Sequence, residues 1–321
     1  MRKFAFAALA LGVAVLVGCS GGGQGLNEDA ISVGFSQVGA ESEWRTANTR
    51  SVKEALVAPE FKLKFSDAQQ KQENQIKALR SFIAQKVDVI AFSPVVESGW
   101  EPVLKEAKGA GIPVVLTDRA VKVSDESLYV SLIGSDFVEE GRRAARWLIE
   151  DSAQAQGPFR VVELQGTVGS APANDRMRGF KEVIQGDSRF EIVRSQSGDF
   201  TRAKGKEVME AFLKAEGATI NVLFAHNDDM AIGAIQAIEE AGLKPGQDIR
   251  VVSIDGVRGA FEAMVAGKLN ATVECNPMLG PQLAQLLRDV HAKREVPKRV
   301  MVDEGVFTRE QAAAELPNRK Y

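Results

Sequence analysis

Four apolar runs in this 321-residue chain each lead into side chains that can hold a hydroxyl group. A carboxylate accepts hydrogen bonds from adjacent hydroxyls, a guanidinium donates two bonds in one plane, and a carboxamide both donates and accepts. Together these groups could satisfy the hydroxyls of one small polar ring. The runs are 112–117, 161–164, 221–225 and 251–254, and the side chains that follow are Asp118 with Arg119, Arg176, Asn227, and Asp255.

The composition of these runs predicts where the polar side chains lie. Short runs of β-branched and aliphatic residues are typical of strands buried on both faces of a parallel sheet. In open parallel sheets, ligands bind just outside the carboxyl ends of the strands. We therefore expect Asp118, Arg176, Asn227 and Asp255 to meet in one cleft.

Each of these side chains also has a simpler interpretation that the sequence leaves open. Asp118 could form a solvated ion pair with Arg119, and Asp255 could belong to a plain turn. Arg176 could pair with an acidic residue of its own helix. Trp44, near the start of a predicted helix, could be an ordinary core residue.

Strand and helix patterns alternate from Ile31 onward. The predicted strands are 31–36, 61–65, 87–92, 112–116, 129–133, 160–164, 190–194, 221–225, 250–254, 270–273 and 299–302. The predicted helices are 43–57, 69–85, 100–108, 137–149, 175–185, 201–215, 229–241, 258–267 and 282–290. Two consecutive series of this kind predict an α/β fold with two doubly wound parallel-sheet lobes.

The predicted lobes have no Pro/Ser-rich linker between them. We assign residues 30–135 with 276–303 to the first lobe and residues 136–275 with 304–321 to the second. Short direct crossovers would join the lobes and could act as a hinge. In the second lobe, we expect Asp228 to cap the helix that follows it and Asn227 to bind a ligand.

The N-terminal segment has the features of an export signal. Arg2 and Lys3 precede an apolar stretch, 4–17, that is too short for a permanent membrane span. The segment ending at Cys19 resembles the lipobox of bacterial lipoproteins. That resemblance implies that residues 1–18 are a signal peptide, that the Cys19 thiol carries lipid, and that 19–29 is a tether. An ordinary signal peptide with an incidental cysteine is the alternative.

The composition narrows the possible partners. The net charge of -3 argues against nucleic acid or an anionic membrane surface as the main partner. The hydrophobic content of 45% is that of a soluble globular protein. If Cys19 is lipidated, Cys275 has no partner, so the exported domain depends on its core and not on a disulfide.

Five motifs in order resemble the ribose/galactose class of periplasmic sugar-binding proteins, which serve ABC transporters. The motifs are Leu116–Arg119, Glu163–Thr167, Asp175–Arg176 with Gly179–Phe180, Asn227–Ala234 and Ile254–Gly256. Within the class, the segments 34–39, 69–77, 99–107 and 194–202 are most similar to the galactofuranose-binding members. The sequence departs from the ribose-binding pattern at Cys275 and at Glu41–Trp44, so ribose itself is not the expected ligand.

The resemblance implies a periplasmic binding protein of type I, in which two lobes close on a monosaccharide. It also implies delivery to an ABC permease of the inner membrane, a location on the periplasmic or extracellular face, a monomeric state and no cofactor. By position in the class, nine residues would bind the sugar: Glu41, Trp44, Arg45, Asp118, Arg119, Arg176, Phe200, Asn227 and Asp255.

The sequence predicts a binding protein and not an enzyme. Within the two predicted lobes, residues 30–321, the chain has no P-loop lysine, no GxGxxG and no GxSxG motif. A retaining glycosidase needs two carboxyl groups about 5–5.5 Å apart, one with a raised pKa. Asp118 and Asp255 come from different lobes, and an arginine beside each is expected to lower the carboxyl pKa. A sensor that binds sugar without transport remains an alternative.

No metal site is expected. His226 and His291 are far apart in the sequence and have no cysteine or carboxylate at metal-ligand spacing. Asp228 and Asp229 lack the surrounding loop of alternating oxygen ligands that calcium requires.

Overall fold

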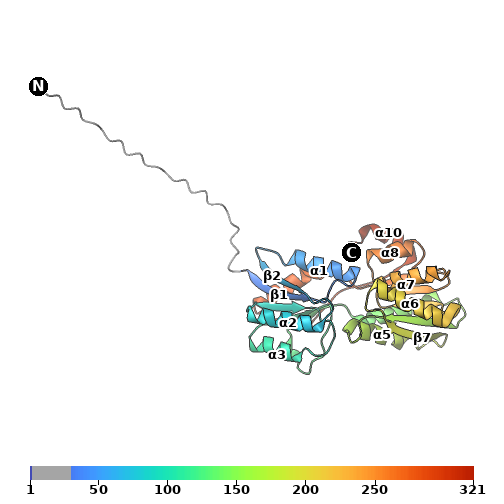
Figure 1. Cartoon of the computed structure of the whole chain (residues 1–321), viewed down its shortest axis with the longest axis horizontal. Helices are drawn as coiled ribbons and strands as arrows, with labels where there is room; N and C mark the ends of the chain where they lie inside the picture. The colour runs from blue at the N-terminus through green and yellow to red at the C-terminus, as the bar shows by residue number, and fades with distance from the viewer. Residues whose placement is uncertain (2–29) are drawn as a thin grey trace.

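The protein folds into two lobes, each built on a six-stranded sheet flanked by helices (Figure 1). The structure is a computed structural model, and it describes Met1 and residues 30–321. The predicted signal peptide (1–18), the lipidation site Cys19 and the tether (19–29) lie outside the described residues. The predicted α/β fold of two doubly wound lobes is confirmed.

The first lobe is a parallel sheet with the strand order β11-β5-β4-β3-β1-β2. Two of its helices, α1 (Glu43–Ala55) and α9 (Gly280–His291), pack on one face, and α2 (Gln72–Ala84) and α3 (Glu101–Gly109) pack on the other. The strands are β1 (Ile31–Gln37), β2 (Phe61–Asp67), β3 (Val89–Phe92), β4 (Val114–Thr117), β5 (Ser131–Gly134) and β11 (Arg299–Met301). Because both faces are covered, β3, β4 and β5 are buried along their whole length.

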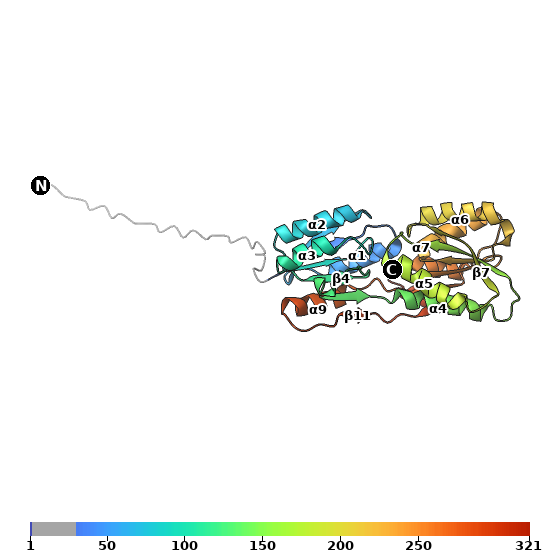
Figure 2. The same ribbon diagram turned by 90° about the horizontal axis from the view of Figure 1, so that it is seen from below.

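The second lobe repeats this plan with the strand order β12-β10-β9-β8-β6-β7, in which only β12 runs antiparallel to its neighbour. The strands are β6 (Phe159–Gln165), β7 (Phe190–Ser197), β8 (Val222–Ala225), β9 (Arg250–Asp255), β10 (Ala271–Glu274) and β12 (Val306–Thr308). The helices are α4 (Phe137–Asp151), α5 (Ala171–Ile184), α6 (Arg202–Glu216), α7 (Asp228–Glu240), α8 (Arg258–Val265) and α10 (Arg309–Glu315). Helices α4 and α5 lie on one side of the sheet, opposite α6 and α7 (Figure 2).

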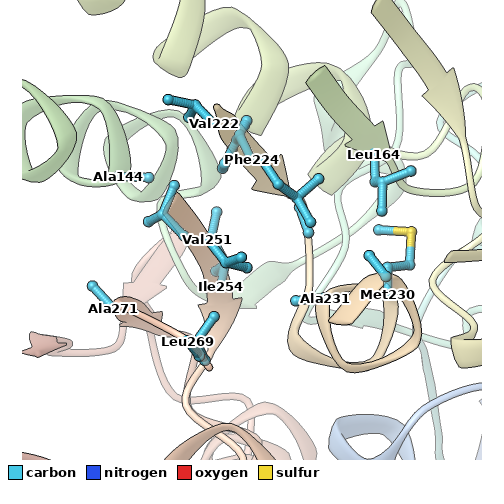
Figure 3. Packing of buried hydrophobic residues seen from close by; sticks show 14 of the residues in the cluster. Ala144, Leu164, Val222, Phe224, Met230, Ala231, Val251, Ile254, Leu269 and Ala271 are labelled. Carbon is cyan, nitrogen blue, oxygen red and sulfur yellow. The ribbon is translucent and has the colours of Figure 1, made fainter. Parts of the chain in front are cut away.

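The core of the second lobe fixes the strand ends that matter for the cleft. Phe224 of β8 is fully buried and stacks on Phe180 of α5, with ring centroids 3.9 Å apart. Met230 and Leu164 pack close to the end of β8 (Figure 3). Among residues 30–321, none of the helices has the length and apolar character that a bilayer span requires.

Several predicted element boundaries were wrong for identifiable reasons. Helix α2 begins at Gln72 and not at residue 69, because Gln69 and Gln70 have φ values of 54° and 60° and form a turn. Helix α5 begins at Ala171, four residues before the prediction, because Pro172 is favourable in a first helical turn. Strand β12 and helix α10 were not predicted, since β12 has only three residues.

Three chain crossings join the lobes, and one carboxyl group ties them together. The first and third crossings follow β5 and β11 of the first sheet, and the second crossing follows β10 of the second sheet. Glu304, in the third crossing, accepts a hydrogen bond through Oε1 from the Ser135 hydroxyl of the first crossing. The same oxygen accepts a bond of 2.9 Å from the Asn276 amide of the second crossing. Glu304 therefore links all three segments of the hinge.

This link predicts a pH dependence of stability. Burial, with Glu140 nearby, raises the pKa of Glu304 to about 8 from 4.5. Between these values the folded protein holds a proton that the unfolded chain releases, so stability is full at low pH and falls as pH rises toward 8. Glu304→Gln keeps the acceptor oxygen and removes the titration. Urea unfolding at several pH values should give the wild type a steeper loss than the variant, by up to about 1.4 kcal/mol per pH unit.

Buried Asp228, whose pKa is raised to about 7 by desolvation, titrates in the same window but is common to both proteins, so it cancels in the comparison. Parallel stability curves for wild type and Glu304→Gln between roughly pH 5 and 8 would contradict this account of the hinge.

Candidate functional site

An enclosed cavity lies between the lobes, at the carboxyl ends of the central strands. The empty space within it, which includes space open to solvent, is about 290 Å³. Residues of both lobes line it, and all nine residues predicted for the site are among them: Glu41, Trp44, Arg45, Asp118, Arg119, Arg176, Phe200, Asn227 and Asp255. Ser42, Pro172 and Cys275 line it as well.

The first lobe contributes a buried cluster of two arginines and two carboxyl groups. Arg45 donates to Asp118 Oδ2 at 2.7 Å and to Glu41 Oε1 at 3.1 Å. Arg119 donates to the carbonyl of Val95 at 3.1 Å. Asp118 is therefore held by Arg45 and is not in a solvated ion pair with Arg119, since both side chains are buried.

Two polar atoms of this cluster have no hydrogen-bond partner among the described residues. They are Arg119 Nε and Glu41 Oε2, both buried. Burial, with Arg45 nearby, lowers the pKa of Arg119 to about 10, which leaves the guanidinium charged at neutral pH. A buried charged donor and a buried carboxyl oxygen without partners are unfavourable unless a ligand bonds to them.

The second lobe positions Arg176 with groups from three other elements. Arg176 Nε donates to Glu140 Oε2 of α4 at 2.7 Å, and Nη1 donates to the carbonyl of His226 at 2.6 Å. Its Nη2 lies 3.5 Å from Asp255 Oδ1 at the end of β9. Arg176 thus pairs across the lobe, and the simpler interpretation of a pair within its own helix is wrong.

The electrostatic environment of Asp255 differs from the prediction. Burial raises the pKa of Asp255 well above its usual value, and the nearby Arg176 only opposes this shift. The expectation that an adjacent arginine lowers the pKa was wrong, because it left out the desolvation of a side chain that is 4% exposed.

Asn227 and Asp228 exchange the predicted roles in the capping of α7. Asn227 Oδ1 is the cap, accepting from the Met230 amide at 3.0 Å, while its amide donates to the Phe200 carbonyl at 3.2 Å. Asp228 instead accepts from Thr272 at 2.8 Å and from the Val257 amide at 2.9 Å. The prediction that Asp228 caps was wrong, and Asn227 both caps α7 and lines the cavity.

Two aromatic rings supply the apolar walls. Trp44 is 5% exposed, and its indole donates to the Cys275 carbonyl at 2.6 Å. The Phe200 ring lies between Arg119 and Arg176, with 5.3 Å and 6.0 Å from the ring centre to the two guanidinium carbons. Such rings could pack on the C–H face of a ligand while the arginines bond to its rim.

The rim of the cavity is closed by direct contacts between the lobes. On one side, the Glu43 amide donates to Asp229 Oδ2 at 2.8 Å, and Arg202 bridges Asp229 and Glu43. On the other side, the Asn174 amide donates to Glu97 Oε2 at 2.7 Å. These contacts describe a closed arrangement of the two lobes.

The sequence did not identify the residues that hold the lining side chains in position. Glu140 hydrogen-bonds to Arg176, but it lies one turn inside α4, where its spacing resembles that of surface residues.

One oxygen or sulfur atom from each of Glu140, Cys275 and Glu304 lies within 4.8 Å of the others, which is the pattern of a possible metal site among the described residues. Glu140 Oε2 accepts from Arg176, and Glu304 Oε1 accepts from Ser135 and Asn276, so protein donors already bond to one oxygen of each carboxyl group, and we assign no metal to them.

Comparison with known proteins gives a consistent picture. A family profile described as "Periplasmic binding protein domain" matches residues 33–294. The galactofuranose-binding protein of Escherichia coli is 51% identical over 293 residues, which cover 90% of this chain and 92% of that protein.

Two solved structures are similar over nearly the whole described chain. A Mycobacterium smegmatis protein in complex with β-D-fucofuranose has a TM-score of 0.89 at 54% identity and covers 91% of this chain and 96% of its own. The binding protein of the arabinose ABC transporter from Shewanella sp. ANA-3, bound to L-arabinofuranose, has a TM-score of 0.86 at 54% identity, covering 90% and 95%.

The close contact between Gly166 and Phe200 predicts a stability effect. A Cβ atom at position 166 would lie 1.9 Å from the Phe200 ring. Gly166→Ala should therefore displace this ring and lower the free energy of unfolding by about 1–3 kcal/mol. Gly109→Ala is the matched control, because a Cβ there meets no atom within 4 Å. Equal unfolding midpoints for the two variants in urea would contradict the predicted packing.

Proposed function

This chain belongs to the periplasmic binding protein family, and from that premise we propose that it captures one monosaccharide in the cavity between its lobes. The proposed ligand is a furanose, either galactofuranose or a related aldose, and the proposed destination is an ABC permease. The nine residues that line the cavity from both lobes are the proposed sugar-binding residues.

The observation that carries this proposal is the chemistry of the enclosed cavity. Arginine donors, carboxyl groups and the Asn227 amide face one small volume between two aromatic rings. A sugar hydroxyl is one donor and two acceptors, so alternating carboxyl and guanidinium groups suit a ring of hydroxyls. The unpartnered atoms Arg119 Nε and Glu41 Oε2 offer further bonds. Five or six charged hydrogen bonds of about 1.5–3 kcal/mol each sum to roughly 8–18 kcal/mol, which is enough for the roughly 8 kcal/mol of a micromolar complex.

The preference for a furanose rests on the relatives. The names and titles of three similar proteins specify galactofuranose, fucofuranose and arabinofuranose, all five-membered rings.

Closure follows from contacts with both lobes. A sugar held by Asp118 and Arg119 in an open cleft gains bonds to Arg176, Asn227 and Asp255 only when the lobes meet. A ligand shifts the equilibrium toward the closed state by the difference in its affinity for the two states. The contacts of Glu43 with Asp229 and Arg202 add to the stability of the closed form.

The cellular setting is also a proposal. We propose that lipid on Cys19 anchors the monomeric protein at the outer face of a bacterial membrane, with residues 30–135 and 276–303 as one lobe and 136–275 and 304–321 as the other. Transport and sensing use the same closed state, so a sensor without transport is the second candidate. The relatives are binding proteins, which favours a protein without enzymatic activity.

Calorimetric titration with D-galactose, L-arabinose, D-fucose, D-ribose and D-fructose tests the proposal. We expect the first three sugars to bind more tightly than the last two. Asp118→Asn and Asp255→Asn should each weaken binding by about 10-fold to 100-fold, because each removes a buried bond to a charged group. Glu73→Gln, which changes an exposed carboxylate of α2, is the control. Heat capacity or circular dichroism should confirm that the variants fold.

Unchanged affinity in both folded aspartate variants would remove the proposed site. Failure of all five sugars to bind to the wild type would reject the proposed ligand class.

A further inference from the structure

Cys275 lies in the cavity wall beside the nine predicted residues and forms hydrogen bonds with residues of both lobes. The residue lines the cavity and is 1% exposed. Its amide donates to the Asp255 carbonyl at 3.0 Å, and its carbonyl accepts from the Trp44 indole at 2.6 Å. The same cavity holds the buried, unpartnered atoms Arg119 Nε and Glu41 Oε2, which indicates a ligand site next to the thiol.

The hydrogen-bond chain behind Cys275 determines where the thiol proton points. Cys275 Sγ lies 3.4 Å from Ser135 Oγ. The Ser135 hydroxyl has one proton, and it donates that proton to Glu304 Oε1. The thiol therefore has two acceptors behind the cavity wall, the Ser135 hydroxyl and the Glu140 carboxyl group, to which Cys275 also hydrogen-bonds. Neither residue lines the cavity, so the S–H group points away from it.

The charge state of the thiol is consistent with this arrangement. Burial raises the pKa of Cys275 well above its usual value, and Glu140 and Glu304 nearby raise it further. The residue thus remains a neutral thiol at physiological pH. A sulfur atom whose proton is already used offers the cavity only a weak acceptor and a polarisable surface.

From this geometry we infer that Cys275 is a specificity-determining residue, which presents a sulfur surface without a hydrogen-bond donor to one part of the bound sugar. The inference rests on the proposed function. A sugar hydroxyl can form strong hydrogen bonds with the other polar side chains of the cavity, among them Asp118, Arg119, Arg176 and Asn227. The ring position that faces Cys275 is the one at which the site tolerates the loss of a hydroxyl.

Titration calorimetry with D-galactose and its 2-deoxy, 3-deoxy and 6-deoxy analogues tests this inference, because each of these sugars can still close the proposed furanose ring through its 4-hydroxyl. In the wild type, one analogue should bind within about threefold of D-galactose, while the others lose about tenfold or more. In Cys275→Ser, the affinity for that same analogue, relative to the affinity for D-galactose, should be about fivefold lower than in the wild type. The serine would donate to Ser135 as the thiol does, but its oxygen would accept well from the sugar hydroxyl.

Two further variants separate specificity from a structural role. Ser135→Ala removes one of the two acceptors of the thiol proton and leaves Glu140, so it should change the preference at the same ring position by less than Cys275→Ser does. Cys275→Ala offers neither donor nor acceptor and should keep the wild-type pattern. A purely structural role would instead lower all affinities by the same factor.

The inference is overturned if D-galactose binds and every deoxy analogue loses tenfold or more, or if Cys275→Ser and Ser135→Ala keep the wild-type pattern. Absence of binding by D-galactose and by the whole set to the wild type is a different result, because it rejects the proposed function and this inference together.

Discussion

The structure depends on the burial of charged side chains from two lobes in one small volume. Arg45, Asp118, Arg176 and Asp255 are each less than 6% exposed, and each would be unfavourable alone in an apolar interior. The protein compensates by pairing them, with Arg45 on Asp118 and Arg176 on Glu140 and Asp255. The pairing is incomplete at the cavity, where a guanidinium nitrogen and a carboxyl oxygen lack partners among the described residues. In the proposed function, the hydroxyls of a sugar ring would complete the pairing, so binding and closure would be one process.

The backbone at the cavity is adapted to this arrangement. Asp118, Phe200 and Asp255 have φ values of 62°, 62° and 131°, in a region that residues other than glycine rarely adopt. Such conformations persist where the surrounding structure holds them, and they concentrate at functional sites. Here they turn the side chains at the ends of buried strands toward the opposite lobe. The hinge is connected to the cavity wall by hydrogen bonds. Glu304 joins the three crossings, and Ser135, which donates to Glu304, also contacts the thiol of Cys275.

The sequence predicted the fold and the composition of the cavity wall because both follow from strong local patterns. Apolar strands that end at Asp118, Asn227 and Asp255 are visible in the chain, and sheet geometry brings parallel strand ends together. The role of Glu140 could not be predicted, since only the packing of α4 against α5 places it beside Arg176. The exchange of roles between Asn227 and Asp228 was missed because both residue types cap helices well. The raised pKa of Asp255 depends on burial, which spacing along the chain does not reveal.

The central claim is that a sugar draws the two lobes together around these charges. Pulsed electron paramagnetic resonance between spin labels at position 77 of α2 and position 203 of α6 measures the separation of the lobes directly, since both positions are exposed and belong to different lobes. Addition of saturating L-arabinose or D-galactose should convert a broad distance distribution into a narrow one at the separation of the closed structure. A distribution that stays the same at a sugar concentration shown by calorimetry to fill the site would contradict the account.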